Sequence, residues 1–404
     1  MSLISFPNNN PVFVDPKANF FINPDRFYQD INNRGSIHSP SPEYNLFCGI
    51  IAAIVSNADL DLTVPQRIGD SPTVKPMPGA ITRENIVGKI CNSTSRILLS
   101  TSGTTGPGKR VSHSLDSLCR GLQINLRHQN DIWGLAYPLN HLAGLQVMLQ
   151  AVINHNTIVQ LFGLPAELIH RSIESNQITH LSCTPTFLKL LSTTNTTHPT
   201  VQSLTTGGER LGRLDQELGK KLFPGARHRN IYALTEIGNL LISENDIFTI
   251  SESLNGKVKI IDGELSIHTS LLASKTNESG DDLYRTGDLV EVIEHNPLKF
   301  RFLTRRDEII NVGGNKVAPQ IVEQSLLEIT GIEQALVYGK GNSLTGQIVA
   351  CDIVTSSNQK LNFDEVRLQL TEQLPKFAVP RIYNLVPTLK MTTNGKLCRR
   401  PQQS

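Results

Sequence analysis

A loop rich in hydroxyl groups and glycine is the part of this sequence best suited to chemistry. Residues 97–99 are apolar and predict a short buried strand, and the residues that follow it, 100–108, are Ser, Thr or Gly except for Pro107. Glycines let backbone N–H groups converge on one point, and hydroxyls add further donors around that point. With Lys109 at its end, the loop is predicted to bind an anion that carries many oxygens, such as a triphosphate.

Two nucleotide-binding motifs compete for this loop. Gly103, Gly108 and Lys109 nearly complete the P-loop pattern G-x-x-x-x-G-K-[ST], but Arg110 follows, so the hydroxyl that would hold magnesium is missing. The other motif is Thr-Ser-Gly-Thr-Thr-Gly followed by Lys. The sequence departs from this motif at Gly108. A Ser/Thr/Gly linker that binds no ligand is a third interpretation. The residues that match the second motif are Thr101, Ser102, Gly103, Thr104, Thr105, Gly106 and Lys109.

The composition argues against several other function classes. The formal net charge is +2, so neither a nucleic acid nor an acidic membrane is indicated as a partner. Residues 1–10 lack the pattern of a signal peptide, and the longest apolar stretch, near residues 47–55, is too short to span a bilayer. Because no cysteines are spaced as C-x-x-C, we expect structural, mostly buried thiols in a reducing cytoplasm. These cysteines are Cys48, Cys91, Cys119, Cys183, Cys351 and Cys398.

Apolar strands and helical patterns alternate through the middle of the chain. This order predicts a parallel sheet that is covered by helices on both faces. The predicted strands are residues 132–136, 157–161, 178–183, 201–204 and 230–232, and the predicted helices are 114–128 with Ser114 as N-cap, 142–153, 165–175, 185–192 and 211–223. Nearer the N-terminus, residues 24–32 and 46–55 predict helices and residues 62–65 the end of a strand.

The pattern changes after residue 255. Short segments broken by Gly, Asp and Asn predict an antiparallel, barrel-like part with strands at 257–261, 264–268, 288–294 and 299–303. Past Asp307, helices at 319–329 and 362–374 and strands at 334–338 and 347–354 predict a small α+β unit. We therefore expect an α/β protein with a large N-terminal domain, residues 1–305, and a small mobile C-terminal domain, residues 306–404, with a hinge at Asp307.

Further short motifs carry residue types that suit ATP chemistry. Residues 232–236 (Tyr-Ala-Leu-Thr-Glu) end on Glu236, a hard oxygen ligand for magnesium, and Thr235 can donate to a phosphate oxygen. Tyr232 offers a flat face to adenine. Asp288, at the end of a Tyr-Arg-Thr-Gly-Asp motif, can accept two hydrogen bonds from the hydroxyls of a ribose. A surface glutamate, a packed core tyrosine and a turn aspartate remain the simpler interpretations of these residues.

Four more short motifs, together with the hydroxyl-rich loop and the motifs that end on Glu236 and Asp288, form an ordered series along the chain. They are residues 138–145 (Pro-Leu-Asn-His-Leu-Ala-Gly-Leu), 206–209 (Thr-Gly-Gly-Glu), 304–314 (Thr-Arg-Arg-Asp-Glu-Ile-Ile-Asn-Val-Gly-Gly) and 394–396 (Asn-Gly-Lys). From about residue 46 to 397 the chain resembles the adenylate-forming family, which contains acyl-CoA synthetases, the adenylation domains of peptide synthetases and luciferases, because the motifs match in type and order. Within that family it most resembles the o-succinylbenzoate and aryl-acid CoA ligases. The departures are Gly108, Ala233 and Thr304, and a shortened N-terminal region.

The resemblance implies roles for residues whose types alone say little. Lys396, by default a solvated tail lysine, would bridge the carboxylate and the α-phosphate during adenylation. The Gly313–Gly314 loop would admit the pantetheine arm of coenzyme A. The turn of Gly207, Gly208 and Glu209 would lie against adenine, and Arg305 would belong to the same nucleotide site.

His141 is the remaining candidate, and its neighbourhood bears on the substrate. The resemblance places His141 at the wall of the acyl pocket, a buried structural histidine is the alternative interpretation, and we do not expect a general base. Residues 136–141 contain no acidic residue, whereas domains that activate α-amino acids carry an aspartate there. An amino-acid substrate is therefore disfavoured, and a small carboxylic acid is expected.

The resulting hypothesis is an ATP-dependent carboxylate ligase. With ATP and Mg²⁺ it would convert a carboxylic acid to an acyl-AMP, and coenzyme A would then take the acyl group. Because two anions must approach each other, positive charge and a metal ion are needed. The alternatives are acylation of the phosphopantetheine of an acyl carrier protein, and a degenerate nucleotide-binding module without catalysis.

Overall fold

A computed structural model gives the structure of the protein for residues 10–33, 39–63, 79–101, 109–125, 128, 130–192, 194, 196–274, 282–355 and 361–389. The chain divides into two compact units. The first is Met1–Asn245 with Thr269–Gly280, and the second is Asp246–His268 with Asp281–Ser404. The boundary at residues 305–307 and the hinge at Asp307 remain predictions. Within the described ranges no helix is long and apolar enough to cross a bilayer.

A mostly parallel sheet forms the centre of the first unit. Its order is β11-β10-β9-β8-β6-β7-β1-β2, with antiparallel pairs only at the two ends of that series. This confirms the predicted parallel sheet. The strands are β1 (Phe13–Asp15), β2 (Phe20–Ile22), β6 (Ile132–Leu135), β7 (Thr157–Gln160), β8 (His180–Cys183), β9 (Ser203–Gly207), β10 (Arg227–Leu234) and β11 (Gly238–Ser243).

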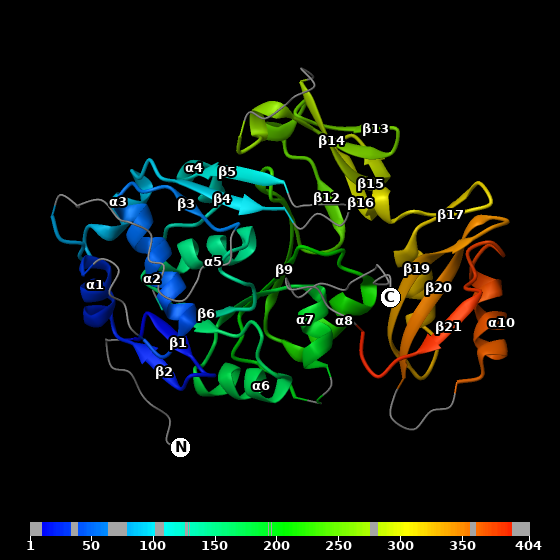
Figure 1. Ribbon diagram of the computed structural model, residues 1–404, viewed down its shortest axis with the longest axis horizontal. Coiled ribbons are helices and arrows are strands. Elements are labelled where there is room, and N and C mark those ends of the chain that lie inside the picture. The colour runs from blue at the N-terminus through cyan, green and yellow to red at the C-terminus, as the bar shows by residue number, and fades with distance from the viewer. Residues whose placement is uncertain are drawn as a thin grey trace. The chain divides into compact units, whose positions relative to one another are not determined.

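Helices cover both faces of this sheet, as Figure 1 shows for α2 and α5 on one side and α6 on the other. Adjacent residues of β7 point to opposite faces: Ile158 belongs to the core beneath α2 and α5, and Val159 to the core beneath α6 and α7. The helices of this unit are α1 (Pro24–Asn32), α2 (Pro42–Val55), α3 (Ile86–Cys91), α4 (Leu115–Leu118), α5 (Leu142–Ile153), α6 (Ala166–Ser175), α7 (Pro185–Leu191) and α8 (Arg213–Leu222).

The helix predicted over residues 114–128 is wrong beyond its first turn. Ser114 caps α4 as expected, its hydroxyl accepting from the Ser117 N–H at 3.3 Å, but α4 ends at Leu118 and Gly121 adopts φ 82°. The following backbone bonds to the side chains of Gln150 on α5 and of Asn154, the C-cap residue of α5, instead of to itself. Gln123 N donates to Gln150 Oε1 at 2.9 Å, and Asn125 N donates to Asn154 Oδ1 at 3.1 Å. Tertiary hydrogen bonds therefore replace the helical ladder that the leucine spacing predicted.

A small separate sheet precedes α4. It consists of β3 (Leu60–Asp61), β4 (Arg96–Ser100) and β5 (Arg110–Ser114), and β4 and β5 pair as an antiparallel hairpin. The thiols are more varied than expected: Cys48, Cys183 and Cys351 are buried, while Cys91 is exposed and Cys119 is half-buried, and all are free cysteines. Cys398 lies outside the described residues.

The second unit contains two further sheets. The antiparallel part predicted after residue 255 has the order β12-β16-β15-β14-β13, formed by β12 (Ile247–Thr249), β13 (Val258–Ile261), β14 (Glu264–His268), β15 (Leu283–His295) and β16 (Leu298–Arg305). The other sheet contains β17 (Ile310–Val312), β18 (Asn315–Val317), β19 (Ile332–Asn342), β20 (Gly346–Thr355) and β21 (Ile382–Leu385).

Two helices pack on that second sheet, α9 (Pro319–Leu327) and α10 (Phe363–Gln373), and Figure 1 shows α10 beside β20 and β21. A common core joins them, in which Val322 and Leu326 of α9 and Leu370 of α10 contact the buried residues of β19 and β20. This is the predicted small α+β unit. Short 3-10 turns lie at η2 (Glu252–Leu254), η3 (Thr269–Leu271) and η4 (Arg306–Glu308).

Candidate functional site

The β4–β5 hairpin presents the hydroxyl-rich loop. Thr101 N donates to Lys109 O at 2.9 Å, and Lys109 N donates to the Thr101 hydroxyl at 2.9 Å, so these two residues close the base of the loop. Lys109 is exposed. The predicted phosphate-binding residues Ser102, Gly103, Thr104, Thr105 and Gly106 lie outside the described residues.

A buried histidine fastens the Thr235–Glu236 segment to this hairpin. His113, on β5, is fully buried, and its Nε2 lies 2.6 Å from the Thr235 carbonyl oxygen, while its Nδ1 lies 3.0 Å from the Ser117 hydroxyl. Burial lowers the pKa of His113 below its usual value, and the hydrogen bond to Thr235 opposes this only in part. The structure therefore brings the strand that follows the hydroxyl-rich loop next to Thr235, the neighbour of the predicted magnesium ligand Glu236, although the two segments lie far apart in the sequence.

Further contacts hold the Glu236 backbone. The Glu236 carbonyl accepts from Ala273 N at 2.8 Å, and the Arg120 guanidinium donates to the carbonyls of Ile237, at 3.4 Å, and Leu271, at 3.2 Å. The Glu236 side chain is half-buried. Hydrogen bonds therefore hold the main chain at Glu236 and at the residue that follows it.

The 138–145 motif forms the entry into α5. His141 is the N-cap of this helix, half-buried and with extended backbone dihedral angles. Gly144 packs directly over the preceding turn, since a Cβ there would lie 2.1 Å from the Pro138 carbonyl oxygen. Only glycine permits this approach, so the glycine of the motif sets the path of the chain around His141.

The 206–209 motif lies at the carboxyl end of β9. Gly207 ends the strand, its carbonyl accepts from the Tyr137 hydroxyl at 3.3 Å, and burial raises the pKa of Tyr137 well above its usual value. Gly208 has φ 81°, and Glu209 follows. The Glu209 carboxylate accepts from the Thr186 backbone N–H at 3.0 Å and from its hydroxyl at 2.7 Å, at the N-terminus of α7.

Glu209 therefore has bonding partners inside the protein, and its predicted place against adenine stays a prediction. Tyr232 lies half-buried on β10, next to β9 in the same sheet. The structure thus places the glycine turn and Tyr232 on neighbouring strands.

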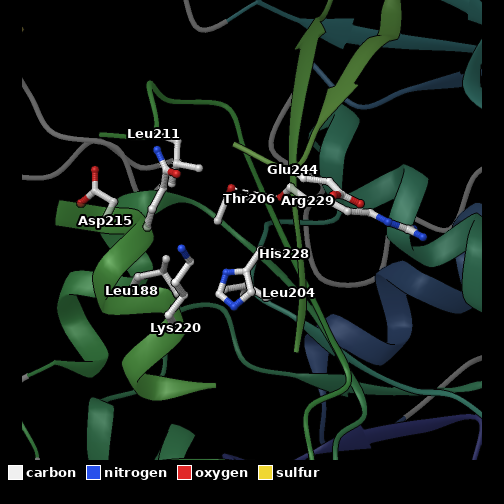
Figure 2. Close-up of a pocket in the computed structure, with 10 residues that line it drawn as sticks. Leu188, Leu204, Thr206, Leu211, Asp215, Lys220, His228, Arg229 and Glu244 are labelled. Atoms are coloured by element: carbon white, nitrogen blue, oxygen red, sulfur yellow. Dashed lines mark hydrogen bonds between the residues drawn. The ribbon is translucent and has the colours of Figure 1, made fainter. Parts of the chain in front are cut away.

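A small cavity lies against these strands. About 20 Å³ in volume, it lies between α8 and strands β9 and β10, and Figure 2 shows Thr206, Arg229 and Asp215 around it, with the Thr206 hydroxyl donating to the Arg229 carbonyl. That volume suits about one water molecule. We conclude that this cavity is not a nucleotide site.

In the second unit, Asp288 and Arg305 form a pair. They face each other across β15 and β16, with Arg305 Nε 3.5 Å from Asp288 Oδ1, and the Asp288 side chain is 9% exposed. Arg305 also donates to the Thr286 carbonyl at 3.0 Å. These contacts bring together two residues predicted for the nucleotide site.

Glu264, which sequence reasoning missed, organises this region. Its buried carboxylate accepts from Gly287 N at 2.8 Å and from Arg285 Nε and Nη2 at 2.9 and 2.7 Å, and it also contacts Arg306. Burial acts to raise the pKa of Glu264, but the bonds from Arg285 and Gly287 and the positive charges of Arg285 and Arg306 outweigh it and lower the pKa. Glu264 therefore fixes the turn that precedes Asp288.

Gly313 and Gly314 form the turn between β17 and β18. Their φ angles are 56° and 86°, both glycines are exposed, and Gly313 N donates to Thr345 O at 2.9 Å. These positive φ angles are ones that glycine adopts readily, so the two glycines of the motif suit this exposed turn. Lys396 lies outside the described residues.

Signals for the missed residues exist in the sequence but are weak. His113 occupies an inward position of β5, where Val111 is the other buried residue. Glu264 is a carboxylate at the first position of a short strand, residues 264–268 (Glu-Leu-Ser-Ile-His), and arginines follow later in the sequence. Only the contacts distinguish these residues from ordinary polar residues.

Comparisons with known proteins agree with these features. A family model described as "AMP-binding enzyme" matches residues 70–262, and one described as "AMP-binding enzyme C-terminal domain" matches residues 321–396. A 2-succinylbenzoate–CoA ligase from Staphylococcus epidermidis is 26% identical over 335 residues, which cover 76% of this chain and 69% of the relative. The same-named protein from Staphylococcus aureus is 28% identical over 328 residues, covering 75% and 65%. The chain thus spans about two thirds of the length of these curated relatives.

Solved structures share the fold. The o-succinylbenzoate CoA synthetase from Bacillus subtilis, in complex with its acyl-adenylate intermediate, superposes with a TM-score of 0.69 at 17% identity, covering 98% of this chain and 95% of that one. The ATP-bound MatB from Rhodopseudomonas palustris gives a TM-score of 0.70 at 15% identity, with coverages of 98% and 95%. These likenesses confirm the expected architecture.

Proposed function

The chain belongs to the family of AMP-binding enzymes, and on this premise we propose that it is an AMP-forming acid–thiol ligase. In the first half-reaction a carboxylate oxygen attacks the α-phosphorus of ATP, an acyl-AMP forms and pyrophosphate leaves. In the second, the thiol of coenzyme A attacks the acyl carbon, a thioester forms and AMP leaves with the thiol proton released. The chain's relatives that are named 2-succinylbenzoate–CoA ligase support this reaction type.

The link between His113 and Thr235 is the observation that carries the proposal. At 2.6 Å it joins the strand that leaves the hydroxyl-rich loop to the segment that ends on Glu236. An adenylation site needs phosphate donors and a metal ligand close together, because negative charge is concentrated at the reacting phosphates. The hairpin supplies Lys109 at the base of the loop, and the fastened segment supplies the carboxylate.

Mg²⁺ fits the donor set of this region. Mg²⁺ is commonly bound by one or two carboxylates together with substrate phosphates and water, rather than by an all-protein cage. Glu236 would be the protein's ligand, on a backbone whose carbonyl is held by Ala273. Among the described residues, the one group of three metal-ligating side chains lies elsewhere, at His128, Asp131 and His180. When bound, the ion would neutralise charge on the phosphates; the protein's part is to hold the Glu236 carboxylate in place.

The proposed substrate is an aromatic acid of the 2-succinylbenzoate class. The names of the relatives support this choice, and residues 136–141 contain no acid that would pair with a substrate amine. Tyr137 and His141 flank the turn that Gly144 holds against α5, where the resemblance places the acyl pocket. The proposed place of action is the cytoplasm, where ATP and coenzyme A are present.

An exchange assay tests the function directly. The purified chain is incubated with ATP, Mg²⁺ and labelled pyrophosphate, with 2-succinylbenzoate, benzoate, a fatty acid and an amino acid tested separately. We expect label to enter ATP with 2-succinylbenzoate or another aromatic acid, and not with the amino acid. Absence of exchange with every acid would contradict the proposal and favour a degenerate nucleotide-binding module.

The thiol acceptor is tested next. With the acid that supports exchange, we expect thioester formation on free coenzyme A. A holo carrier protein is the comparison, and acylation of that protein alone would replace coenzyme A by a carrier-bound phosphopantetheine in this proposal.

We further propose that residues 306–404 turn about Asp307 between the half-reactions. Lys396 would serve adenylation and the Gly313–Gly314 loop would admit the pantetheine arm, and both lie on this predicted domain. Lys396→Ala should abolish acyl-AMP formation yet spare thioester formation from supplied acyl-AMP, while Asp307→Pro should do the reverse. Lys376→Ala, at an exposed lysine of the same unit, is the control. Equal loss of both half-reactions in both variants, with the fold intact, would contradict this two-pose mechanism.

A further inference from the structure

Two histidines and an aspartate lie close together at the amino-terminal ends of two inner strands of the main sheet, away from the motifs considered so far. His128 and Asp131 precede β6, and His180 is the first residue of β8, so all three lie at the amino ends of parallel strands. The predicted adenine turn at Gly207–Gly208 follows the carboxyl end of β9. The cluster is therefore not part of the proposed adenylation site.

The potential ligand atoms of the cluster face one another. His128 Nδ1 lies 2.8 Å and His180 Nε2 lies 3.4 Å from the same oxygen, Asp131 Oδ2. Asp131 and His180 are 12% and 13% exposed, whereas His128 is 36% exposed. The cluster is thus buried enough to orient its members and open enough on the His128 side to admit an ion.

Backbone contacts fix both halves of the cluster. Asp131 N donates to the His128 carbonyl at 3.1 Å, which closes the turn that carries these two side chains. Ile132 N donates to the Thr179 hydroxyl at 2.8 Å, and the register of β6 and β8 sets Trp133 beside His180. The arrangement therefore follows from the sheet itself.

Two imidazoles and a carboxylate are a donor set that suits divalent transition metals, zinc above all. We propose that His128, Asp131 and His180 form a binding site for one such ion, with Zn²⁺ as the ion to test. The Thr179 hydroxyl lies 3.0 Å from His180 Nδ1, the contact to a second ring nitrogen that typically orients a metal-binding histidine.

The two separations from Asp131 need little adjustment, and all three ligand atoms lie within 4.8 Å of one another. Zinc bonds of about 2.0–2.1 Å in tetrahedral geometry set ligand atoms roughly 3.3 Å apart. The 3.4 Å separation already matches this value, and the 2.8 Å separation must open by about 0.5 Å, which the more exposed His128 can supply. Water would complete the coordination. The bound ion would cross-link the turn before β6 to the start of β8.

The single tryptophan of the chain provides a local reporter. The Trp133 ring lies 4.8 Å from the His180 ring, centroid to centroid. We therefore propose titrating the metal-free full chain, without a histidine tag, with Co²⁺ while following tryptophan fluorescence, and with Zn²⁺ by calorimetry. The expected result is one Zn²⁺ per chain and Co²⁺ quenching that saturates at one site, both in the presence of millimolar Mg²⁺.

Variants decide whether these residues bind the ion. His128→Gln, His180→Gln and Asp131→Asn should each weaken Zn²⁺ binding at least tenfold and remove the saturable quenching. His295→Gln, at an exposed histidine of the second unit, should change neither. Zn²⁺ should also raise the melting temperature of the parent chain but not of His128→Gln, whose exposed position makes it the variant least able to disturb the fold. Absence of stoichiometric binding, or binding that persists in both His128→Gln and His180→Gln, would overturn the proposal.

Discussion

Replacing Glu264 by glutamine removes the charge from a carboxylate on which several N–H groups of the second unit converge. One oxygen accepts from Gly287 N at 2.8 Å, and the other accepts from Arg285 and Arg306. The side chain is only 4% exposed. A glutamine has one oxygen and one NH₂ group, so whichever way its amide is turned, a donor faces a donor.

The structure sets the size of the effect. A buried donor left facing other donors costs about 1–3 kcal/mol, so Glu264→Gln should lower the free energy of unfolding by that amount. Glu294→Gln is the matched control. Its partner Lys299 lies 2.6 Å away, but both side chains are substantially exposed, at 35% and 44%, and such surface pairs contribute roughly 0–1 kcal/mol.

The assays are urea denaturation of both variants and hydrogen exchange of the peptide that contains Gly287. We expect Glu264→Gln to unfold at lower urea and to exchange faster at this turn, and we expect a higher KM for ATP because Asp288 follows directly. Glu294→Gln should behave like the parent chain. If the two variants were equally stable and the Gly287 peptide were equally protected, the positioning role of Glu264 would be refuted.

The pH dependence gives a second check with a defined sign. The folded-state pKa of Glu264 is lowered from 4.5, so its carboxylate stabilises the fold fully above about pH 4.5. That contribution is lost as the pH falls through the lower folded-state value. The stability difference between the parent chain and Glu264→Gln should therefore shrink below pH 4.5, and a difference that stays constant there would contradict the assigned cause.

Further predictions concern other sites. Glu236→Ala should lower pyrophosphate exchange by about a hundredfold or more without unfolding the chain; unchanged exchange across a magnesium titration would rule out Glu236 as the ligand. Asp288→Ala should remove contacts worth roughly 1.5–3 kcal/mol each to ribose, measured as weaker ATP binding by calorimetry. Burial and the neighbouring His170, opposed by Glu174, lower the pKa of His198. The unfolded chain therefore binds more protons than the folded chain below about pH 6.5, and the stability of the fold should decrease there. A melting temperature that stays constant from pH 7.5 to 5.5 would contradict this.

The local pattern predicted much of the first unit. The helix predicted over residues 142–153 begins and ends where α5 does. Its apolar spacing and the turn before it both indicate a helix that starts at Leu142. The helix at residues 24–32 coincides with α1, whose Asn23 cap and Pro24 are local signals. Strand–helix alternation likewise predicted the parallel sheet.

Pairing between distant segments could not be predicted in this way. β1 joins β7 in parallel, although β1 was not expected and lies more than 140 residues before its partner, as the register pair Phe13 and Ile158 shows. The region after Leu118 departs from its helical spacing because the side chains of Gln150 on α5 and of its C-cap residue Asn154 accept hydrogen bonds from its backbone N–H groups. Such partners lie far away in the sequence, so no local window contains the information.

The division between sequence and tertiary structure is clearest at the candidate site. Motif order alone identified the family, and the proposed reaction type and the predicted roles of residues such as Glu236 and Asp288 follow from their chemistry and immediate neighbours. Tertiary structure decided what holds them: His113 bonds the chain at Thr235, and Glu264 bonds the turn at Gly287. The physical reason is that a short motif specifies which atoms react, whereas their placement depends on buried polar groups that must find partners wherever the fold brings a donor or an acceptor within reach.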